Sequence, residues 1–432
     1  MKRSLAWVVL IVVLGLVAFL SFGSRDRESG EAPARLVPTV ASEVDRGREL
    51  VDLADCRSCH TARGGAAFAG GRAIPTPFGT FYTPNITPDV KTGLGSWNAT
   101  DFWHALHNGY SKGGTLLYPT FPYTNYTKIS RRDSDAMFAY LHSLRPVAQT
   151  NHPHALRFPY DYRILLVAWR SLFFRPGVFE PEQGQSAEWN RGAYLVQGMA
   201  HCSACHESRN ALGATSSKAG PSGGLVLNWY APSLTNPHEA GVQGWSETDI
   251  ATLLKTGRVD TSTANTAALG PMAEVVSESL QQAPDDELRA MATYLKALPA
   301  ADAPAEGTSG PGAPKYDIPP AILAAGKDLY EKNCADCHGH DGEGRKPATP
   351  PLAGNRGVLM DSAVNPIRMV LFGGYSPGTT GNSRPFGMPP YSLTLSDEEI
   401  AEVLIYVRAS WGNAARPKRG EEVSANRGRP LW

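Results

Sequence analysis

The sequence predicts an all-α protein made of three consecutive repeated domains behind an apolar N-terminal segment. Three observations lead to this prediction. The motif C-x-x-C-H occurs three times and uses all six cysteines of the chain. Similar helical patterns precede and follow each copy, as expected when a whole domain has been duplicated. The 432 residues suffice for several domains, and plentiful Gly (43) and Pro (34) favour short helices joined by long loops.

The N-terminus consists of Lys2 and Arg3 followed by an apolar run, Leu5–Gly23. Nineteen residues rising about 1.5 Å each span roughly 28 Å, close to the hydrocarbon thickness of a bilayer. A fair small-x-small pattern at Ser21 also fits cleavage of a signal peptide. Residues 1–30 are therefore expected to be a membrane anchor or a removed signal, and we favour the anchor. Both interpretations send the rest of the chain out of the cytoplasm.

The three motifs read CRSCH from Cys56, CSACH from Cys202 and CADCH from Cys334. C-x-x-C-H is the attachment pattern of c-type haem. Two thiols three residues apart on a helical turn can form thioethers to the two vinyl groups of one porphyrin. The histidine that follows can then bind the iron as its proximal ligand. The sequence thus predicts three covalently bound haem c groups. The expected thioether ligands and iron ligands are Cys56, Cys59, His60, Cys202, Cys205, His206, Cys334, Cys337 and His338.

Other uses of these cysteines explain the pattern less well. A redox dithiol needs C-x-x-C but not the following histidine. A zinc site needs four ligands, and no second C-x-x-C lies near any of the three. Disulfides between such close cysteines would constrain very little chain. One C-x-x-C-H could arise by chance, whereas three that use every cysteine favour haem.

Each repeat begins with a short helical pattern and ends with an amphipathic one. The first patterns are GRELVDLAD, GAYLVQGMAH and GKDLYEKN, which begin at Gly47, Gly192 and Gly326. The closing patterns contain a tyrosine at one matching place, namely Tyr140, Tyr294 and Tyr406. We expect the closing helix to pack across the first, with these tyrosines in the core. Ser396 with Glu399 indicates a capping box at the start of the last closing helix.

A second axial iron ligand is expected between the middle and closing helices of each repeat. Met272 lies 67 residues after Cys205 and Met388 lies 51 after Cys337, both in Pro-containing loops. Thioether sulfur is a common sixth ligand of haem c and raises its potential. The first repeat has Phe121 at the matching place, and phenylalanine cannot bind iron. For that haem, His107 is a candidate ligand. A five-coordinate iron and a loosely held ligand are the alternatives, and His104 and His107 could instead be ordinary helix-surface residues.

The segments between the repeats complete the domain map. Tyr162–Phe174 is a strongly apolar helix candidate, too short to span a bilayer, which would pack between domains or form a docking surface. The stretch from Pro299 is rich in Ala, Pro and Gly and is expected to be a semi-flexible tether that lets the third domain move. A polar tail is expected to lie extended. The predicted divisions are 1–30, 41–148, 149–186, 187–298, 299–318, 319–412 and 413–432.

The quoted motifs, together with IPTPFGTFYTPNITPD, LYPTFPYTNYT, SAEWNRGAYLVQGMAHCSACH and FGMPPYSLTLSDEEI, give the chain a family likeness. From about residue 41 to 412 it resembles the tri-haem cytochrome c subunits of bacterial membrane-bound dehydrogenases. The resemblance implies three class-I-like cytochrome c domains on the periplasmic side of the inner membrane. It departs from the family at Phe121, where many members have methionine. The apolar N-terminal segment and Phe121 together favour the subunits that accompany molybdenum-dependent aldehyde dehydrogenases.

The resemblance also implies partners. A large catalytic subunit, with or without a small iron-sulfur or other subunit, would oxidise an aldehyde, an alcohol or a sugar acid. This chain, not catalytic alone, would pass the electrons to ubiquinone or to a terminal oxidase. Balanced charge, with 41 basic and 41 acidic residues, gives no indication of a nucleic-acid partner. The alternatives are a cytochrome subunit of a terminal oxidase and a multihaem peroxidase-like enzyme with an open first haem.

Overall fold

The computed structural model describes residues 41–215, 222–301, 316–346 and 348–428. The predicted N-terminal anchor and most of the Ala/Pro/Gly-rich tether lie outside these residues. The chain forms two compact units. One contains Ala62–Glu180 with the described residues up to Leu50, and the other contains Pro181–Trp432 with Val51–Thr61. Among the described residues, no helix is both long enough and apolar enough to cross a membrane.

The first repeat contains helices and a small antiparallel sheet. The sheet has the order β1-β2-β3, with Ile74 opposite Phe81 and Thr80 opposite Ala155. The middle helix α4 begins at a capping box formed by Asn98 and Asp101 and continues as a wider π-helical turn, η1. The elements are α2 (Ala41–Leu53), α3 (Cys56–His60), β1 (Ala73–Thr76), β2 (Gly79–Tyr82), α4 (Ala99–Trp103), η1 (His104–Asn108), α5 (Tyr123–Tyr126), α6 (Arg131–Ser143), β3 (Ala155–Leu156) and α7 (Leu165–Phe173).

The second repeat has the same order of long helices. Its middle helix α10 is capped by the Ser246 side chain, which accepts from the Asp249 amide, and ends at Gly257 in the left-handed conformation. The elements are α8 (Ala187–Tyr194), η2 (Leu195–Met199), α9 (Ser203–His206), β4 (Gly224–Val226), β5 (Trp229–Ala231), α10 (Glu247–Thr256), β6 (Arg258–Asp260), β7 (Asn265–Ala267), α11 (Pro271–Glu278), η3 (Leu280–Gln282) and α12 (Asp285–Ala297).

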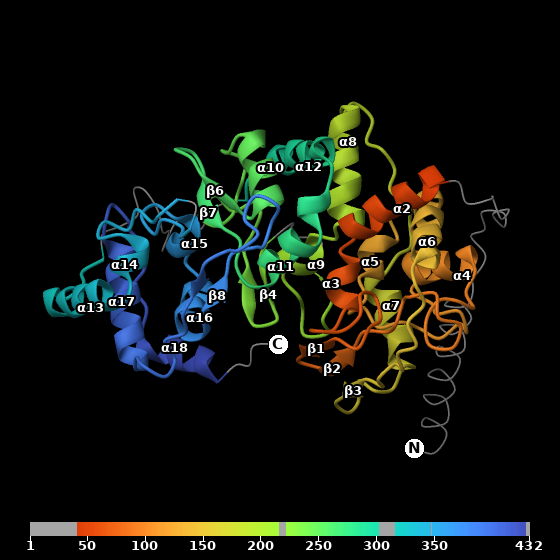
Figure 1. Cartoon of the computed structure of the whole chain (residues 1–432), viewed down its shortest axis with the longest axis horizontal. Coiled ribbons are helices and arrows are strands. Elements are labelled where there is room, and N and C mark those ends of the chain that lie inside the picture. The colour runs from red at the N-terminus through yellow and green to blue at the C-terminus, as the bar shows by residue number, and fades with distance from the viewer. Residues whose placement is uncertain (1–40, 216–221, 302–315, 347, 429–432) are drawn as a thin grey trace, which may run out of the picture. The chain divides into compact units, whose positions relative to one another are not determined.

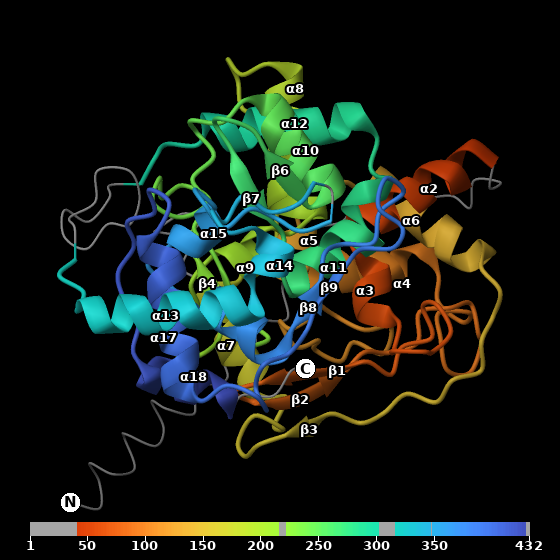
Figure 2. The same ribbon diagram turned by 60° about the vertical axis from the view of Figure 1, so that its left-hand side comes forward.

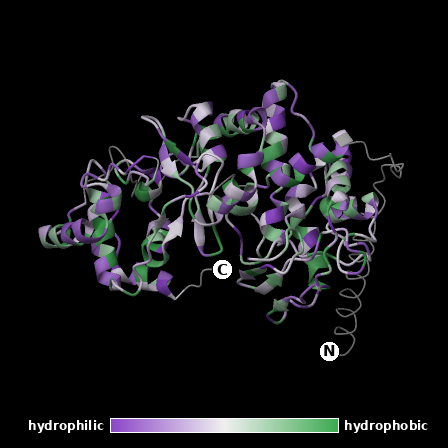
Figure 3. Cartoon of the chain, viewed as in Figure 1, coloured by the Kyte–Doolittle hydropathy of each residue, from purple (hydrophilic) through white to green (hydrophobic). Residues whose placement is uncertain are grey.

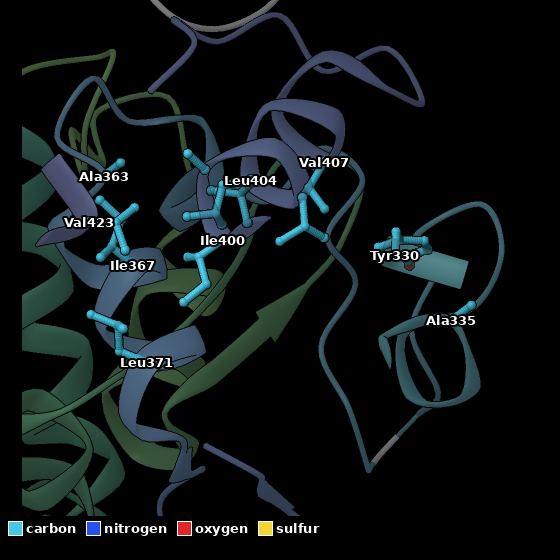
Figure 4. Packing of buried hydrophobic residues seen from close by; sticks show 12 residues of the cluster. Tyr330, Ala335, Ala363, Ile367, Leu371, Ile400, Leu404, Val407 and Val423 are labelled. Atoms are coloured by element: carbon cyan, nitrogen blue, oxygen red, sulfur yellow. The ribbon is translucent and has the colours of Figure 1, made fainter. Parts of the chain in front are cut away.

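The third repeat buries a cluster of aliphatic side chains between its helices. Figure 4 shows Ile367 and Leu371 of α16 beside Ile400 and Leu404 of α17, and all four are almost fully buried. The predicted capping box of Ser396 and Glu399 is confirmed at the start of α17. The elements are α13 (Pro320–Asn333), α14 (Ala335–His338), α15 (Arg356–Leu359), α16 (Val364–Phe372), β8 (Gly374–Tyr375), β9 (Gly387–Met388), α17 (Asp397–Ala409) and α18 (Gly420–Arg427).

In every repeat the closing helix crosses the first helix at a glycine. A Cβ added to Gly192 of α8 would lie 1.9 Å from the carbonyl oxygen of Ala290 in α12. The matching glycines are Gly47, against Ala136, and Gly326, against Glu402. Both views show α13 crossing α17 (Figures 1 and 2). Only glycine allows the two backbones to approach this closely, which confirms the expected helix crossing.

The matching tyrosines lie next to these helix crossings. A Cβ on each glycine would also lie within 2.9 Å of the Cβ of Tyr140, Tyr294 or Tyr406. Tyr294 is buried, whereas Tyr140 and Tyr406 are half-buried. Most helices show hydrophobic and hydrophilic residues side by side in Figure 3, as expected when one face is covered. The short hairpins β1–β2, β4–β5, β6–β7 and β8–β9 add local strands to the all-α prediction without joining the repeats into one sheet.

The second and third repeats belong to one compact unit and are hydrogen-bonded to each other. The Asn365 side chain accepts from the Tyr230 amide at 2.9 Å and donates to the Tyr230 carbonyl at 2.8 Å. Gln281 donates to the Gly378 carbonyl at 3.0 Å and accepts from the Thr380 amide at 3.1 Å. These contacts differ from the expectation of a freely moving third domain. Side chains far from the tether hold the two repeats together, and tether composition could not reveal them.

The C-terminal tail is also more ordered than expected. It forms α18, whose Val423 is fully buried in the cluster of Figure 4. Arg427 pairs with Asp397 at the start of α17 at 2.7 Å. The expectation of an extended tail is therefore wrong. Burial of Val423 and the contacts of Arg427 with Asp397 and with the Leu395 carbonyl help to hold a helix in a segment that is polar by composition.

Candidate functional site

Each C-x-x-C-H motif lies on a short helical turn directly after the first helix of its repeat. Cys56 and Cys59 lie on α3, which ends at His60. Cys202 immediately precedes α9 and Cys334 immediately precedes α14, and these turns end at His206 and His338. Residues three apart on a helical turn lie on one side of it. The two thiols of each motif can therefore face the same group.

All six cysteines are free thiols, half-buried or exposed. Burial raises the pKa of Cys202 and of Cys334 to about 12, and that of Cys205 to about 11. The described residues contain no group of three or more His, Cys, Asp or Glu side chains able to hold a metal ion. The structure therefore leaves all six thiols available for covalent attachment.

Two of the motif histidines are oriented by a proline carbonyl. The Nδ1 atom of His206 lies 2.7 Å from the carbonyl oxygen of Pro232, and that of His338 lies 3.1 Å from the carbonyl oxygen of Pro350. Because a carbonyl only accepts, the proton must be on Nδ1, and Nε2 has the lone pair that a metal needs. Burial lowers the pKa of both imidazoles, which favours the neutral, ligating form.

These proline carbonyls were not identified from the sequence. Pro232 lies in APSLT just after β5, and Pro350 lies in TPPLAG before α15. The sequence contains a signal for them, because APSLT resembles TPNIT of the first repeat and both have proline at the second place. The shared proline could have been read as a conserved role within the chain.

Met272 is the second residue of α11, and the backbone just before it has little conformational freedom. The preceding Gly270 has a φ of 52°, and a Cβ there would lie 2.5 Å from the ring of Trp229. Glycine is thus required by both the left-handed backbone and the close ring. Pro271 then starts the helix. The backbone of Met272 is held in one place while its side chain stays half-buried.

Met388 is held in a comparable way by a two-stranded hairpin. Met388 lies in β9 and pairs with Gly374 in β8. A Cβ on Gly373, whose φ is 67°, would lie 2.3 Å from the Met388 carbonyl oxygen. The side chain of Met388 is half-buried. The expected loops are thus a helix start at Met272 and a short strand at Met388, and in each a nearby glycine with positive φ permits a close backbone contact.

Four of the other described methionines fit a packing role better. Met137, Met199 and Met291 are fully buried, and Met360 is nearly so. Met369 is half-buried on α16, where it lies near Gly374. Met272 and Met388 are thus more exposed than the four methionines of the hydrophobic core.

The first repeat lacks a methionine in this loop. Phe121 is half-buried, and its ring centroid lies 5.4 Å from that of Tyr126. His107 is buried within η1, with its Nδ1 atom 2.8 Å from the Thr127 carbonyl and its ring stacked on Trp103 at 4.4 Å. His104 instead contacts Asn108 at 3.0 Å. The carbonyl contact of His107 is the kind found at His206, whereas the stack on Trp103 is typical of a core residue.

One buried donor fits a bound acidic group. The indole of Trp245 is 2% exposed, and within the described residues its Nε1 atom has no hydrogen-bond acceptor. Buried donors in native proteins nearly always have a partner, so an acceptor from a bound molecule would satisfy it. Haem has two carboxylate side chains. The second repeat thus has four features that fit haem c: paired thiols, an oriented imidazole, a fixed methionine and this indole. The third repeat has the same features except the indole.

Comparisons with known proteins agree with this chemistry. The family model for cytochrome c matches residues 44–145 and 323–411. These two ranges contain the first and third C-x-x-C-H motifs. The second repeat has the same helix order and the same glycine crossing without a match to that model.

Three relatives each cover most of the chain. The cytochrome c subunit of a quinone alcohol dehydrogenase from Gluconacetobacter polyoxogenes is 38% identical, over 90% of this chain and 84% of that protein. The gluconate 2-dehydrogenase cytochrome c subunit of Pantoea cypripedii is 35% identical over 94% and 92%. The fructose dehydrogenase cytochrome subunit of Gluconobacter japonicus is 35% identical over 87% and 82%. The chain therefore belongs to the family of dehydrogenase cytochrome c subunits.

Proposed function

We propose that this chain is the multihaem electron-transfer subunit of a periplasmic, membrane-bound dehydrogenase complex. It would not be catalytic alone. A large catalytic subunit, with or without a small additional subunit, would deliver electrons, and ubiquinone or a terminal oxidase would accept them. The observation that supports this most is the pairing of a C-x-x-C-H turn with a carbonyl-oriented histidine, found at His206 and again at His338.

We further propose three class-I-like cytochrome c domains, each with one covalently bound haem c. Their bounds are 41–148, 187–298 and 319–412, with linkers at 149–186 and 299–318 and the C-terminal segment at 413–432. The repeated glycine crossing supports this division, because each crossing closes one helix pair on itself. The segment 1–30 would anchor the chain to the inner membrane.

The residues of the chain would act by binding and tuning, not by acid–base chemistry. Bound haem c supplies a one-electron iron couple. Cys202 with Cys205, and Cys334 with Cys337, would fix the position of each group. Pro232 and Pro350 hold the rings of His206 and His338 in the ligating tautomer, which also increases imidazole basicity. Met272 and Met388 would provide thioether ligands that favour the reduced iron.

The hydrogen bonds between the second and third repeats support a fixed geometry for electron transfer. Asn365 and Gln281 link the two repeats at separate points. Two groups bound in these repeats would keep a constant separation, and electron hopping would not wait for domain motion. The first haem would differ, because Phe121 cannot bind iron. His107 is the candidate ligand there, and a five-coordinate iron is the alternative.

A haem count tests the proposal directly. The pyridine haemochrome assay on purified mature protein should give three haem c per chain. Replacing Cys202 and Cys205 with alanine should reduce the count to two, and fewer than three haems in the parent protein would contradict the domain model. Co-purification should recover a dehydrogenase subunit, whereas a copper-haem oxidase core would support the oxidase alternative. Strong carbon monoxide binding to the reduced parent protein would support the peroxidase-like alternative.

A further inference from the structure

The helix α7 is apolar on both faces, and only one face is covered. Leu166, Arg170 and Phe174 are buried and recur every four residues, which defines the inner face. Arg170 donates to the Asn108 carbonyl at 2.6 Å, and its guanidinium lies 4.7 Å from the ring centroid of Tyr110. These contacts hold α7 on the unit that contains Ala62–Glu180. The orientation of its outer face is therefore fixed.

The outer face presents large apolar side chains to solvent. Phe158 is 80% exposed, Ile164 62% and Leu172 69%. We call this surface the outer apolar face, and its members are Phe158, Tyr162, Ile164, Leu165, Leu172 and Phe173. On the hydropathy scale of Figure 3 most of α7 is hydrophobic. These six large apolar side chains, all exposed within residues 158–173, indicate an interaction site, because isolated exposed leucines are common but such groups are not.

We propose that the outer apolar face inserts into the surface of a bilayer that contains anionic lipids. Exposed Arg157 and Arg175 lie at the two ends of the segment, with half-buried Arg163 between them and one acid, Asp161. Arginine next to exposed aromatic and aliphatic side chains is typical of helices that lie in the membrane interface. The chain as a whole is neutral, so this excess of positive charge is local.

The length of chain before the first described residue supports the same occupant. Seventeen residues separate the apolar run Leu5–Gly23 from α2, which begins at Ala41. Even a fully extended chain of that length reaches only about 60 Å. If the run is the proposed anchor, the unit that contains α7 remains close to the bilayer. The inference rests on the proposed anchor only in this respect.

A protein partner fits the outer apolar face less well. Specific protein interfaces usually contain about one hydrogen bond per 100–200 Å² and a polar rim. The outward residues of α7 itself are Leu165, Ala168, Leu172 and Phe173, which have no side-chain donor or acceptor. The hydrocarbon of a bilayer requires no hydrogen-bond donor or acceptor from the protein. The same side chains that would leave a protein interface poor in polar contacts suit a lipid surface.

Site-directed spin labelling tests the proposal on the full haem-loaded chain. The six native cysteines would be bound to haem, so an introduced cysteine is the one free thiol. Leu172→Cys places the label on the outer apolar face, and Val90→Cys, 68% exposed in the same unit, is the matched control. Each labelled protein is bound to vesicles of phosphatidylcholine and phosphatidylglycerol at a ratio of about four to one. Collision with oxygen and with a water-soluble nickel chelate is then measured.

At position 172 we expect oxygen collisions to rise and nickel collisions to fall several-fold on vesicle binding, with little change at position 90. A label at 172 that stays as accessible to nickel as the control would overturn the proposal. The label at 172 could instead be protected from nickel only when the co-purifying catalytic subunit is added, and not by vesicles. That result would also overturn the proposal and assign the outer apolar face to that subunit. Haem content and electron uptake report on the proposed function separately, so either proposal can fail alone.

A charge variant provides the second test. Arg157→Gln combined with Arg175→Gln should weaken the nickel protection at position 172 on anionic vesicles. On pure phosphatidylcholine the same double variant should match the parent. Equal protection on anionic vesicles would contradict the lipid charge preference.

Discussion

The Nδ1 atom of His206 lies 2.7 Å from the carbonyl oxygen of Pro232, and the same relationship holds between His338 and Pro350 at 3.1 Å. Two repeats that share little sequence in these loops thus orient the histidine in the same way. A backbone carbonyl imposes no requirement on the loop side chains. The geometry can persist while APSLT and TPPLAG diverge.

Replacing His338 with alanine should remove the proximal ligand while leaving Cys334 and Cys337 in place. We expect the haem count to stay at three and carbon monoxide binding by the reduced protein to rise by about one haem per chain. The matched control is His340→Ala, because His340 is exposed and pairs with Glu331. An equal rise in the control, or no rise in His338→Ala, would contradict the assignment of His338 as an iron ligand.

The crossing of α8 and α12 predicts a steric defect in Gly192→Ala. Helix propensity alone would favour alanine by about 1 kcal/mol. The added Cβ, however, would lie 1.9 Å from a backbone oxygen that cannot rotate away. Overpacking of this kind costs about 1–3 kcal/mol and occasionally more. We expect a net loss of roughly 2 kcal/mol in the free energy of unfolding, measured by denaturant titration.

Gly244→Ala is the control for this experiment. No atom lies within 4 Å of a Cβ added there. Its free energy of unfolding should change by less than about 0.5 kcal/mol. Equal losses in the two variants would mean that glycine is not needed for the helix crossing.

The helix scaffold was largely predictable from the sequence, and the supporting contacts were not. Glycine at the start of each first pattern and tyrosine in each closing pattern recur at fixed places, and the structure brings them together. Contacts such as Asn365 with Tyr230 join residues 135 positions apart and occur once. No repeat or periodicity marks a contact that occurs once. Burial of Val423 could not be predicted for a similar reason, since a single apolar residue in a polar tail forms no pattern.

Gln281 should couple the second repeat to the loop that leads to Met388. Its side chain donates to the Gly378 carbonyl and accepts from the Thr380 amide. Gln281→Ala should therefore speed hydrogen exchange of the Thr380 amide, measured by mass spectrometry on a peptide spanning 376–386. Exposed Gln282→Ala is the neighbouring control. Unchanged exchange in Gln281→Ala would mean that the loop is held by other contacts.

Arg408 should be among the residues of the third repeat that are least tolerant of substitution. It is fully buried and donates to the carbonyls of Arg416 at 3.1 Å and Met360 at 3.0 Å, and also to that of Val358. Burial lowers the pKa of its guanidinium to about 10, which still leaves it charged at neutral pH. Arg408→Met should strand these acceptors and cost about 3–5 kcal/mol of unfolding free energy. Exposed Arg289→Met should cost less than about 0.5 kcal/mol, and a similar loss in both would refute the role of the buried bonds.

Phe121→Met tests the coordination proposed for the first haem. The substitution supplies the thioether that the second and third repeats have in Met272 and Met388. We expect the near-infrared band of methionine-bound ferric haem to grow by about half, as two such centres become three. The potential of one haem should rise, because thioether sulfur favours Fe(II). The control Phe121→Leu has no sulfur and should change neither quantity. No change in Phe121→Met would show that this loop does not face the iron, whereas loss of an existing band would show that a native methionine had been displaced.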